Sequence, residues 1–142
     1  MIDVRIVQTP GERDDAFRVR IAVFVDEQRI PREEELDADD DRALHCVAYV
    51  DGEAVGAGRL VEMDGYGKIG RMAVLREHRG HGIGKAILDA LEREGAARGL
   101  REIRLSAQLT ARGFYERAGY EGVGDVYDEV GIPHIAMRKA VA

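Results

Sequence analysis

The sequence has a single cysteine, Cys46, and no long run of apolar residues. A lone cysteine cannot form a disulfide within the chain, and residues 1–5 lack the basic-then-apolar pattern of a signal peptide. No stretch approaches the roughly 18 apolar residues that span a bilayer. These absences argue against a disulfide-stapled scaffold and a membrane-spanning protein, and we expect a chain in the thiol-reducing cytoplasm.

An excess of basic charge is also lacking. The chain has 27 acidic residues and 21 lysines and arginines, which gives a formal net charge of −6. Such a chain repels a polyanion unless its basic side chains gather on one face. We therefore expect no nucleic-acid partner.

Spacings typical of metal ligands are absent as well. The four histidines share no short spacing with Cys46 or with one another; they are His45, His78, His81 and His134. Structural zinc sites usually draw their ligands from closely spaced cysteines and histidines. We therefore expect no bound metal.

No internal repeat, low-complexity tract or Pro- or Ser-rich linker divides the 142 residues. A chain of this length fits one domain, because domains commonly have about 100 to 150 residues. With 45% apolar and 34% charged residues, the composition is that of a globular protein. We expect residues 1–142 to form a single domain.

Residue spacing predicts the elements at the start of the chain. Residues 2–6 alternate apolar and polar as a strand does, and residues 12–24 carry apolar side chains at mostly helical intervals. The acidic run 33–41 is expected to be a loop. This run either attracts a cationic molecule or is simply a solvated surface segment.

A meander of strands and a second helix are expected next. Turn signals at Asp51-Gly52 and at Gly65 and Gly67 separate three β-rich stretches, which are residues 43–50, 54–61 and 69–75. The apolar residues from Ile83 onward have the spacing of an amphipathic helix that runs to about Arg98 and stops at Gly99.

The last third of the chain is expected to complete a mixed sheet flanked by helices, an α/β arrangement. Residues 103–107 alternate as a strand, and residues 110–118 are helical and capped by Gly119. One or two closing strands are expected in residues 127–130 and 134–137. An exposed strand edge at this end of the chain is compatible with a homodimer.

The segment Arg79-Gly80-His81-Gly82-Ile83-Gly84 lies between a predicted strand and a predicted helix. Glycines let the backbone approach a bulky anion, and the free amides at a helix N-terminus receive phosphate oxygens. Arg79 and Lys85 add positive charge to an otherwise acidic chain. The turn therefore predicts a pyrophosphate site, with a glycine-rich helix entry that binds nothing as the alternative.

Spacing separates three glycine motifs at this turn. A dinucleotide G-x-G-x-x-G pattern fails at Lys85, and a G-x-x-x-x-G-K-[ST] phosphate loop fails at Arg79 and Ala86. The pattern [QR]-x-x-G-x-[GA] is met by Arg79, Gly82 and Gly84. A nucleotide-phosphate enzyme is therefore disfavoured.

These residues resemble the acetyl-CoA segment of the GNAT (GCN5-related N-acetyltransferase) superfamily. Residues 108–120, QLTARGFYERAGY, resemble the second signature of that family, N-x-x-A-x-x-F-Y-E-x-x-G-F. Gln108 replaces the usual Asn and keeps an amide, and Tyr120 replaces Phe. The two signatures occur in the family's order, and the resemblance covers most of the chain.

The resemblance implies a fold and a cofactor site. It implies a twisted mixed sheet that splays open between the strand ending at Val74 and the strand ending at Ala107, with acetyl-CoA in the gap. The residues expected to contact the cofactor are Met72, Ala73, Val74, Arg79, Gly80, His81, Gly82, Ile83, Gly84, Lys85 and Gln108.

The resemblance also implies an activity. The expected reaction moves an acetyl group from acetyl-CoA to a primary amine of a small molecule or peptide, by direct attack in a ternary complex. Tyr115 matches the family's usual proton donor, and its alternative role is a helix tyrosine packed against the sheet. A non-catalytic acyl-CoA-binding sensor or interaction module is the alternative for the whole chain.

A weaker likeness points to a bacterial ElaA-like branch of the superfamily, and it is carried by residues 23–28, by the acidic run with Asp37, by His45 and Arg71, and by residues 127–134. This likeness indicates relatives and no particular acceptor. The candidate acceptor-site residues are Phe24, Glu27, Arg71, Tyr127 and His134. Arg71 either binds an acceptor carboxylate or pairs with one of the many acids. The general base is open: Lys68 stands where some members have a glutamate, and the remaining candidates are Glu27, His45, Glu129 and His134.

Overall fold

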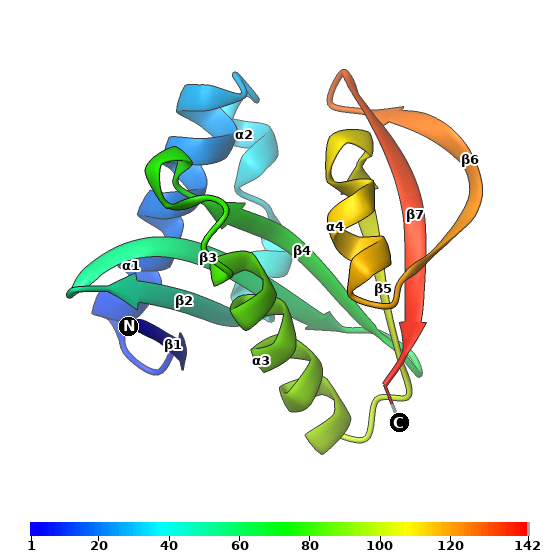
Figure 1. Cartoon of the computed structure of the whole chain (residues 1–142), viewed down its shortest axis with the longest axis horizontal. Coiled ribbons are helices and arrows are strands. Elements are labelled where there is room, and N and C mark those ends of the chain that lie inside the picture. Colours follow the sequence, from blue (N-terminus) through cyan, green and yellow to red (C-terminus); the bar gives the residue numbers. More distant parts are fainter. Residues whose placement is uncertain (142) are drawn as a thin grey trace.

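The computed structural model describes residues 1–141, and its central feature is a seven-stranded sheet with the strand order β1-β2-β3-β4-β5-β7-β6 (Figure 1). Strands β4 and β5 are parallel, and the other neighbours are antiparallel. The strands are β1 (Ile2–Ile6), β2 (Leu44–Val50), β3 (Glu53–Glu62), β4 (Gly67–Val74), β5 (Glu102–Gln108), β6 (Glu121–Glu129) and β7 (Ile132–Ala140). The expected meander is therefore confirmed as β2, β3 and β4.

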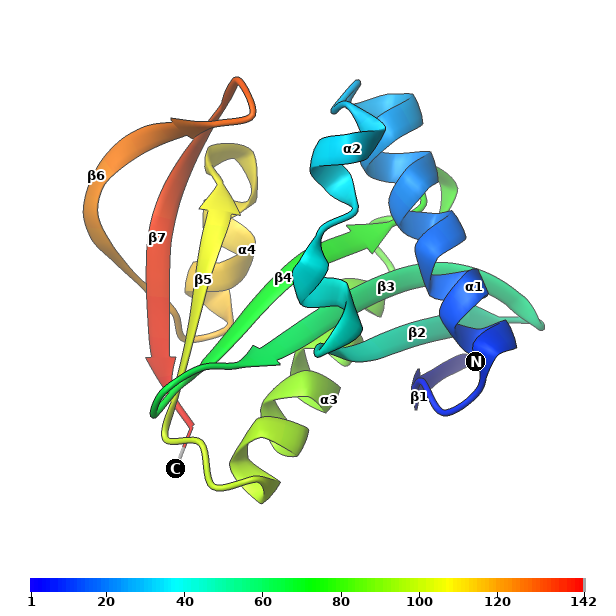
Figure 2. The ribbon, with the colours of Figure 1, turned by 180° about the vertical axis from the view of Figure 1, so that it is seen from behind.

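Helices cover both faces of the sheet. Helices α1 and α2 lie on one face, and α3 and α4 lie on the other, as the views from the front and from behind show (Figures 1 and 2). The helical segments are α1 (Pro10–Arg20), the π-helix η1 (Ile21–Glu27), α2 (Arg32–Glu35), η2 (Ala38–Asp41), η3 (Arg76–His78), α3 (Ile83–Ala97), η4 (Leu109–Ala111) and α4 (Arg112–Arg117). The mixed sheet flanked by helices agrees with the sequence-based prediction.

Each face of the sheet has its own apolar core. One core lies under α3 and includes Ile87, Leu88 and Leu91, and the other lies under α1 and includes Val19. Gly56 in β3 is required by the close approach of α3, because a Cβ atom there would lie 2.7 Å from Ile87 Cδ1. The glycines that interrupt the β-rich sequence of β3 therefore make room for this helix.

The N-terminus of α1 is fixed by a capping box. The amide of Glu12 donates to Thr9 Oγ1 at 3.1 Å, and the amide of Thr9 donates to Glu12 Oε1 at 3.2 Å. These bonds satisfy amides that a helix leaves without a partner. The expected helix of residues 12–24 thus begins at Pro10, and beyond Arg20 the chain continues as the π-helix η1.

The sheet splays open between β4 and β5. The two strands pair only at Gly67/Ile103, Lys68/Arg104 and Ile69/Leu105, and beyond these pairs they diverge (Figure 2). A bulge in the pairing of β3 with β4 lies on the same stretch, where Arg71 adopts a left-handed φ of 54°. The expected opening between these strands is confirmed.

The prediction of an acidic loop at residues 33–41 was wrong. The segment forms α2 and η2, and the side chains of Glu35 and Asp40 are buried. Arginines that are distant in the sequence neutralise these two carboxylates, while Glu33, Glu34 and Asp41 of the same segment are exposed.

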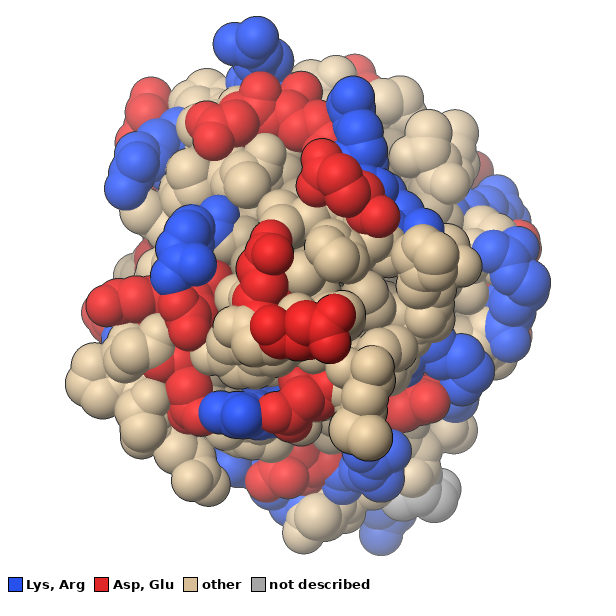
Figure 3. Space-filling model, turned by 60° about the vertical axis from the view of Figure 1, so that its left-hand side comes forward, with Lys and Arg blue, Asp and Glu red and all other residues tan. Residues whose placement is uncertain are grey.

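The last two strands and the charged surface complete the description. Two closing strands are present, and β6 begins earlier than expected, at Glu121. Within residues 1–141, no helix is long and apolar enough to cross a membrane. On the face shown in Figure 3, acidic side chains are widespread and basic ones are scattered among them, as expected from the net charge.

Candidate active site at the splayed strands

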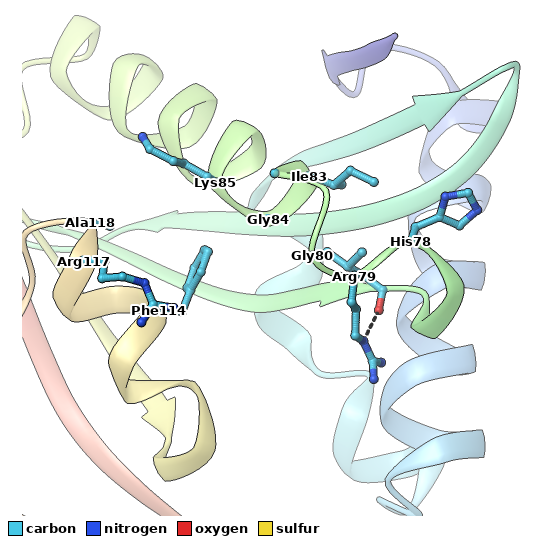
Figure 4. A pocket seen from close by; sticks show the side chains of 11 residues that line it. His78, Arg79, Gly80, Ile83, Gly84, Lys85, Phe114, Arg117 and Ala118 are labelled. Carbon is cyan, nitrogen blue, oxygen red and sulfur yellow. Dashed lines mark hydrogen bonds between the residues drawn. The ribbon is translucent and has the colours of Figure 1, made fainter.

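A cavity of about 550 Å³ lies between the first turn of α3 and helix α4 (Figure 4). Phe114 and Arg117 of α4 face the glycine turn across this space. The cavity includes many of the residues expected to contact the cofactor. It is lined by Val74, His78, Arg79, Gly80, Gly82, Ile83, Gly84, Lys85, Phe114, Arg117 and Ala118.

The glycine turn presents backbone amides that have no partner. Gly80 and Gly82 have φ values of 81° and 82°, a conformation that favours glycine, and Gly82 is the N-cap of α3. Within the described part of the chain, no amide of residues 80–85 donates to a backbone carbonyl. Free amides and the partial positive charge of a helix N-terminus together form a site suited to an anion.

The guanidinium of Arg79 is already engaged. Its Nε donates to the carbonyl oxygen of Val74 at 2.9 Å, and its two terminal nitrogens donate to the Glu27 carboxylate at 2.8 and 2.7 Å. The hydrogen bond from Arg79 lowers the pKa of Glu27 below its ordinary value. Arg79 thus fixes η1 to the turn, and Glu27 is an ionised partner and a poor proton acceptor.

A second cavity, of about 750 Å³, occupies the gap between the diverging strands. It is bounded by Phe24 from η1, Met72 and Ala73 from β4, and Gln108 from β5. Val74 and Arg79 line both cavities, so the two spaces adjoin at the end of β4. Among the expected cofactor residues, His81 lines neither cavity.

Two glutamines meet across this second cavity. Gln108 Nε2 donates to Gln28 Oε1 at 2.7 Å, which connects the end of β5 with the end of η1. Sequence reasoning singled out Gln108 through its signature but gave no role to Gln28. The contact joins residues 80 positions apart, and no local pattern signals it.

Tyr115 lies at the base of the second cavity. Its side chain is largely buried and packs edge-to-face against Phe114 and Tyr120, with ring centroids 5.0 and 5.8 Å away. Burial raises the pKa of Tyr115 well above its ordinary value, so the hydroxyl stays protonated at neutral pH. The residue thus packs against its neighbours and also lines the cavity.

The C-terminal hairpin supplies His134 and Glu129 to the same cavity. The ring of His134 stacks on that of Tyr127 at a centroid distance of 6.2 Å, and the Tyr127 hydroxyl is hydrogen-bonded to Ser106. His45, by contrast, lines neither cavity. It is buried on β2, where its Nε2 contacts the carbonyl oxygen of Asp40 at 2.9 Å.

A buried ion cluster supports the opposite wall. Arg20 is 1% exposed and bonds to Glu35 and Asp40 at 2.6 and 2.8 Å. Arg59 bonds to Asp37 and Asp40, and Arg71 bonds to Glu35 and Asp37. We use the name "buried ion cluster" for Arg20, Glu35, Asp37, Asp40, Arg59 and Arg71.

The cluster decides one alternative that the sequence left open. Arg71 Nε lies 3.1 Å from Glu35 Oε1 and its Nη2 lies 3.0 Å from Asp37, so this arginine pairs with acids. Three arginines face three carboxylates in the cluster, which is therefore formally neutral. Sequence reasoning missed Arg20. It follows Ala16 by four positions and so lies on the buried side of α1, where a charged residue needs a partner of opposite charge.

Fold, glycine turn and second signature together define a class of protein. The model of the Acetyltransferase (GNAT) domain matches residues 12–141, and the chain belongs to this family.

Particular relatives are similar over nearly their whole length. The N-acetyltransferase YjcF of Bacillus subtilis, described as uncharacterized, is 42% identical over 135 residues, which cover 94% of this chain and 96% of YjcF. The crystal structure of Escherichia coli ElaA has a TM-score of 0.85 at 28% identity and covers 98% of this chain and 99% of ElaA. An acyl-CoA N-acyltransferase of Pseudomonas aeruginosa has a TM-score of 0.84 at 30% identity, over 99% of both chains.

Proposed function

We propose that residues 1–142 act as an N-acetyltransferase domain that moves an acetyl group from acetyl-CoA to a primary amine of a small molecule or peptide. The observation that carries this proposal is the set of unpartnered amides at residues 80–85, which open onto a cavity that adjoins a second cavity containing Tyr115. Membership of the GNAT family supports the proposal, as does the likeness to an acyl-CoA N-acyltransferase.

The residues of the first cavity fit the diphosphate of coenzyme A. The amides of the glycine turn would bind its oxygens, and Lys85 and Arg117 lie at the same cavity with positive charge. Gly84 has no side chain and so leaves space between the first turn of α3 and Phe114 of α4, because a Cβ atom there would lie 3.3 Å from the Phe114 ring. The side chain of Arg79 serves a different purpose, since Glu27 and Val74 hold it.

The free edge of β4 fits the pantetheine arm. Beyond Ile69 this strand pairs with β3 on one side only, because β5 has turned away. The backbone groups of Met72, Ala73 and Val74 on the open side are therefore available to an extended ligand. A backbone amide placed at the thioester carbonyl can contribute roughly 3 kcal/mol to transition-state stabilisation.

Tyr115 would supply the proton that the departing thiolate needs. A hydroxyl that remains protonated at neutral pH is suited to this role, and general acid catalysis typically contributes a factor of about 100 or more. In the proposed mechanism both reactants are bound together, and the amine attacks directly. The protein contributes mainly positioning and electrostatics.

Hydrogen exchange of the turn amides tests the cofactor site. Addition of millimolar acetyl-CoA should protect the amides of residues 80–85 and raise the melting temperature, because a ligand at 100 times its Kd stabilises the folded state by about 2.7 kcal/mol. The solvent-exposed hairpin turn at Asp51 and Gly52 is the internal control and should exchange unchanged. Absence of protection at the glycine turn would contradict the proposal.

A thiol-release screen tests the transfer itself. The panel comprises alkylamines, amino acids, polyamines and peptide N-termini, each with acetyl-CoA. Release of free thiol that depends on the amine is the expected result. Cofactor protection without release for any amine would instead favour the acyl-CoA-binding module.

A further inference from the structure

His134 is a buried histidine with one ring nitrogen fixed by the backbone. Its Nδ1 lies 2.7 Å from the carbonyl oxygen of Ile132, two residues earlier at the start of β7. The side chain is 6% exposed, yet the residue lines the second cavity. The ring is therefore held in place at the wall of the proposed acceptor site.

This contact determines where the proton of the neutral ring lies. A carbonyl oxygen only accepts hydrogen bonds, so Nδ1 must carry the proton. Nε2 of the neutral ring then has a free lone pair. A histidine in this tautomer can take up a proton at Nε2 without losing its hydrogen bond to Ile132.

Nε2 has a carboxylate nearby. Glu129 Oε2 lies 3.7 Å from Nε2, and the Glu129 side chain is 49% exposed and reaches solvent. The other neighbours carry no charge: Tyr127 stacks on the ring from β6, and Gln108 is its paired residue on β5. The adjacent segment η4, Leu109–Ala111, has no titratable side chain, and Tyr115 lines the same cavity from α4.

The other candidate bases are less suited. Glu27 is engaged by Arg79 at 2.7 Å and by Arg76 at 3.5 Å. His45 lines neither cavity.

We infer that His134 Nε2 is the general base of the proposed acetyl transfer, and that Glu129 passes the proton on to solvent. This inference rests on the proposed function and adds a requirement on the acceptor, which is an alkyl primary amine that arrives as an ammonium ion.

The protons and bonds of the step balance. His134 Nε2 takes one proton from the ammonium ion, and the freed nitrogen lone pair forms the bond to the thioester carbonyl carbon. As the carbon–sulfur bond breaks, Tyr115 gives its proton to the sulfur, and the second proton lost by the nitrogen restores the Tyr115 hydroxyl. One proton per turnover leaves through Glu129.

The tautomer can be tested without any acceptor. Long-range ¹H–¹⁵N correlation spectra of the protein labelled with ¹⁵N-histidine, with His134 assigned through His134→Gln, should show a protonated Nδ1 and a bare Nε2 in the neutral ring. A neutral ring that carries its proton on Nε2 would overturn the inference, because no lone pair would then face the cavity.

The kinetic test uses the best alkylamine of the thiol-release panel. His134→Gln should lower kcat about 100-fold or more and remove the rise of kcat/KM with pH that we expect for the wild-type protein. The smaller variant His134→Ala should recover activity when imidazole is added. Both variants should keep the melting-temperature shift with acetyl-CoA, which shows that they fold and bind the cofactor.

Variants of Glu129 and of its neighbour Asp128 provide a matched test and control. Glu129→Gln should lower kcat less than His134→Gln does and keep the pH-dependent rise, because the base is still present. Asp128→Asn, one position earlier on β6 and exposed, should leave the rate unchanged.

The outcomes separate the two proposals. If the wild-type protein transfers acetyl groups and His134→Gln retains both the rate and the pH profile, the base assignment is wrong and the enzyme assignment stands. If the wild-type protein neither binds acetyl-CoA nor releases thiol, the proposed function fails, and the base assignment fails with it.

Discussion

Arg79 belongs to the glycine-turn motif, but its side chain holds the turn in place and is not free to bind a ligand. The sequence marks it as part of a phosphate-binding turn, and the structure shows its guanidinium bonded to Glu27 and to the Val74 carbonyl oxygen. The groups of the turn that are free to bind an anion are backbone amides, and the amino-acid sequence indicates these only indirectly. At the scale of single residues, a charge near a site can therefore organise the site without contacting the ligand.

Replacement of Tyr115 by phenylalanine tests the proton donor. Tyr115→Phe removes one hydroxyl and keeps the ring that packs on Phe114 and Tyr120. We expect thiol release to fall about 100-fold or more, with the melting-temperature shift by acetyl-CoA unchanged. Because burial raises the pKa of Tyr115, any alkaline decline of the wild-type rate that reports this group should lie above the ordinary range of tyrosine.

The matched control is Tyr66→Phe. Tyr66 lies in the turn before β4, stacks under Arg104 and lines neither cavity. Equal rate losses in the two variants would rule out a specific role for Tyr115.

The segment formed by α2 and η2 is held in place by arginines from three other elements. Arg20 comes from α1, Arg59 from β3 and Arg71 from β4, and together they hold the carboxylates of the segment. This segment forms one wall of the second cavity. Loss of the buried ion cluster should therefore affect the acceptor site as well as stability.

Asp40 makes the cluster sensitive to acid. Burial opposes ionisation of Asp40, but hydrogen bonds and charges from Arg20 and Arg59 outweigh it and lower the pKa from 3.8 to about 2. Because the folded-state pKa is depressed, this carboxylate stabilises the fold above its ordinary pKa, by about 2 kcal/mol. That contribution should disappear as the pH falls from roughly 4 to 2, as measured by urea unfolding.

Asp40→Asn should lower the free energy of unfolding at pH 7 by about 3 to 5 kcal/mol, because two buried arginines lose a partner. The variant should also lose part of the acid dependence. Asp39→Asn is the control, since Asp39 is partly exposed and pairs only with Arg42 among the described residues. Similar losses in both variants would contradict the role of the cluster.

Gly56→Ala tests the contact between β3 and α3. A Cβ atom at this position would lie 2.7 Å from Ile87 Cδ1 and 2.9 Å from Ile83 Cγ2. Overpacking of this kind typically costs about 1 to 3 kcal/mol. Because Ile83 is the first residue of α3, we also expect weaker acetyl-CoA binding, measured by calorimetry. Gly11→Ala, with its nearest contact at 4.0 Å, should have little effect on binding.

At the scale of the whole molecule, strand β6 is an exposed edge. All nine of its residues are exposed, and Val123 and Val126 are 42% and 49% accessible; Val130, in the turn that follows, is 42% accessible. Apolar edge strands tend to be covered by a partner. We expect a homodimer, measured by sedimentation equilibrium, that Val126→Lys weakens. A wild-type monomer across the micromolar range would contradict this expectation.

Local patterns predicted the strands, the glycine turn and α3 well, because the alternation of β1 and the glycines at 80 and 82 report short-range geometry. Contacts between distant segments were missed. The burial of Glu35 and Asp40 was missed because their arginine partners lie at positions 20, 59 and 71. The Gln28–Gln108 contact was missed for the same reason, since only the assembled fold brings these partners together. The π-helix η1 was missed because the apolar residues of 12–24 have the spacing of any helix and do not separate an α-helix from a π-helix.

Strands β4 and β5 are joined by only three residue pairs, which affects how easily they can move apart. The other neighbouring strands are paired near both of their ends, apart from local register shifts, but beyond Ile69 no residue pair joins β4 and β5. Widening the gap there breaks no backbone pair between β4 and β5, and the hydrogen bond between Gln28 and Gln108 is one side-chain contact that it would strain. We therefore expect the sheet to open more easily at this gap than between its other strands.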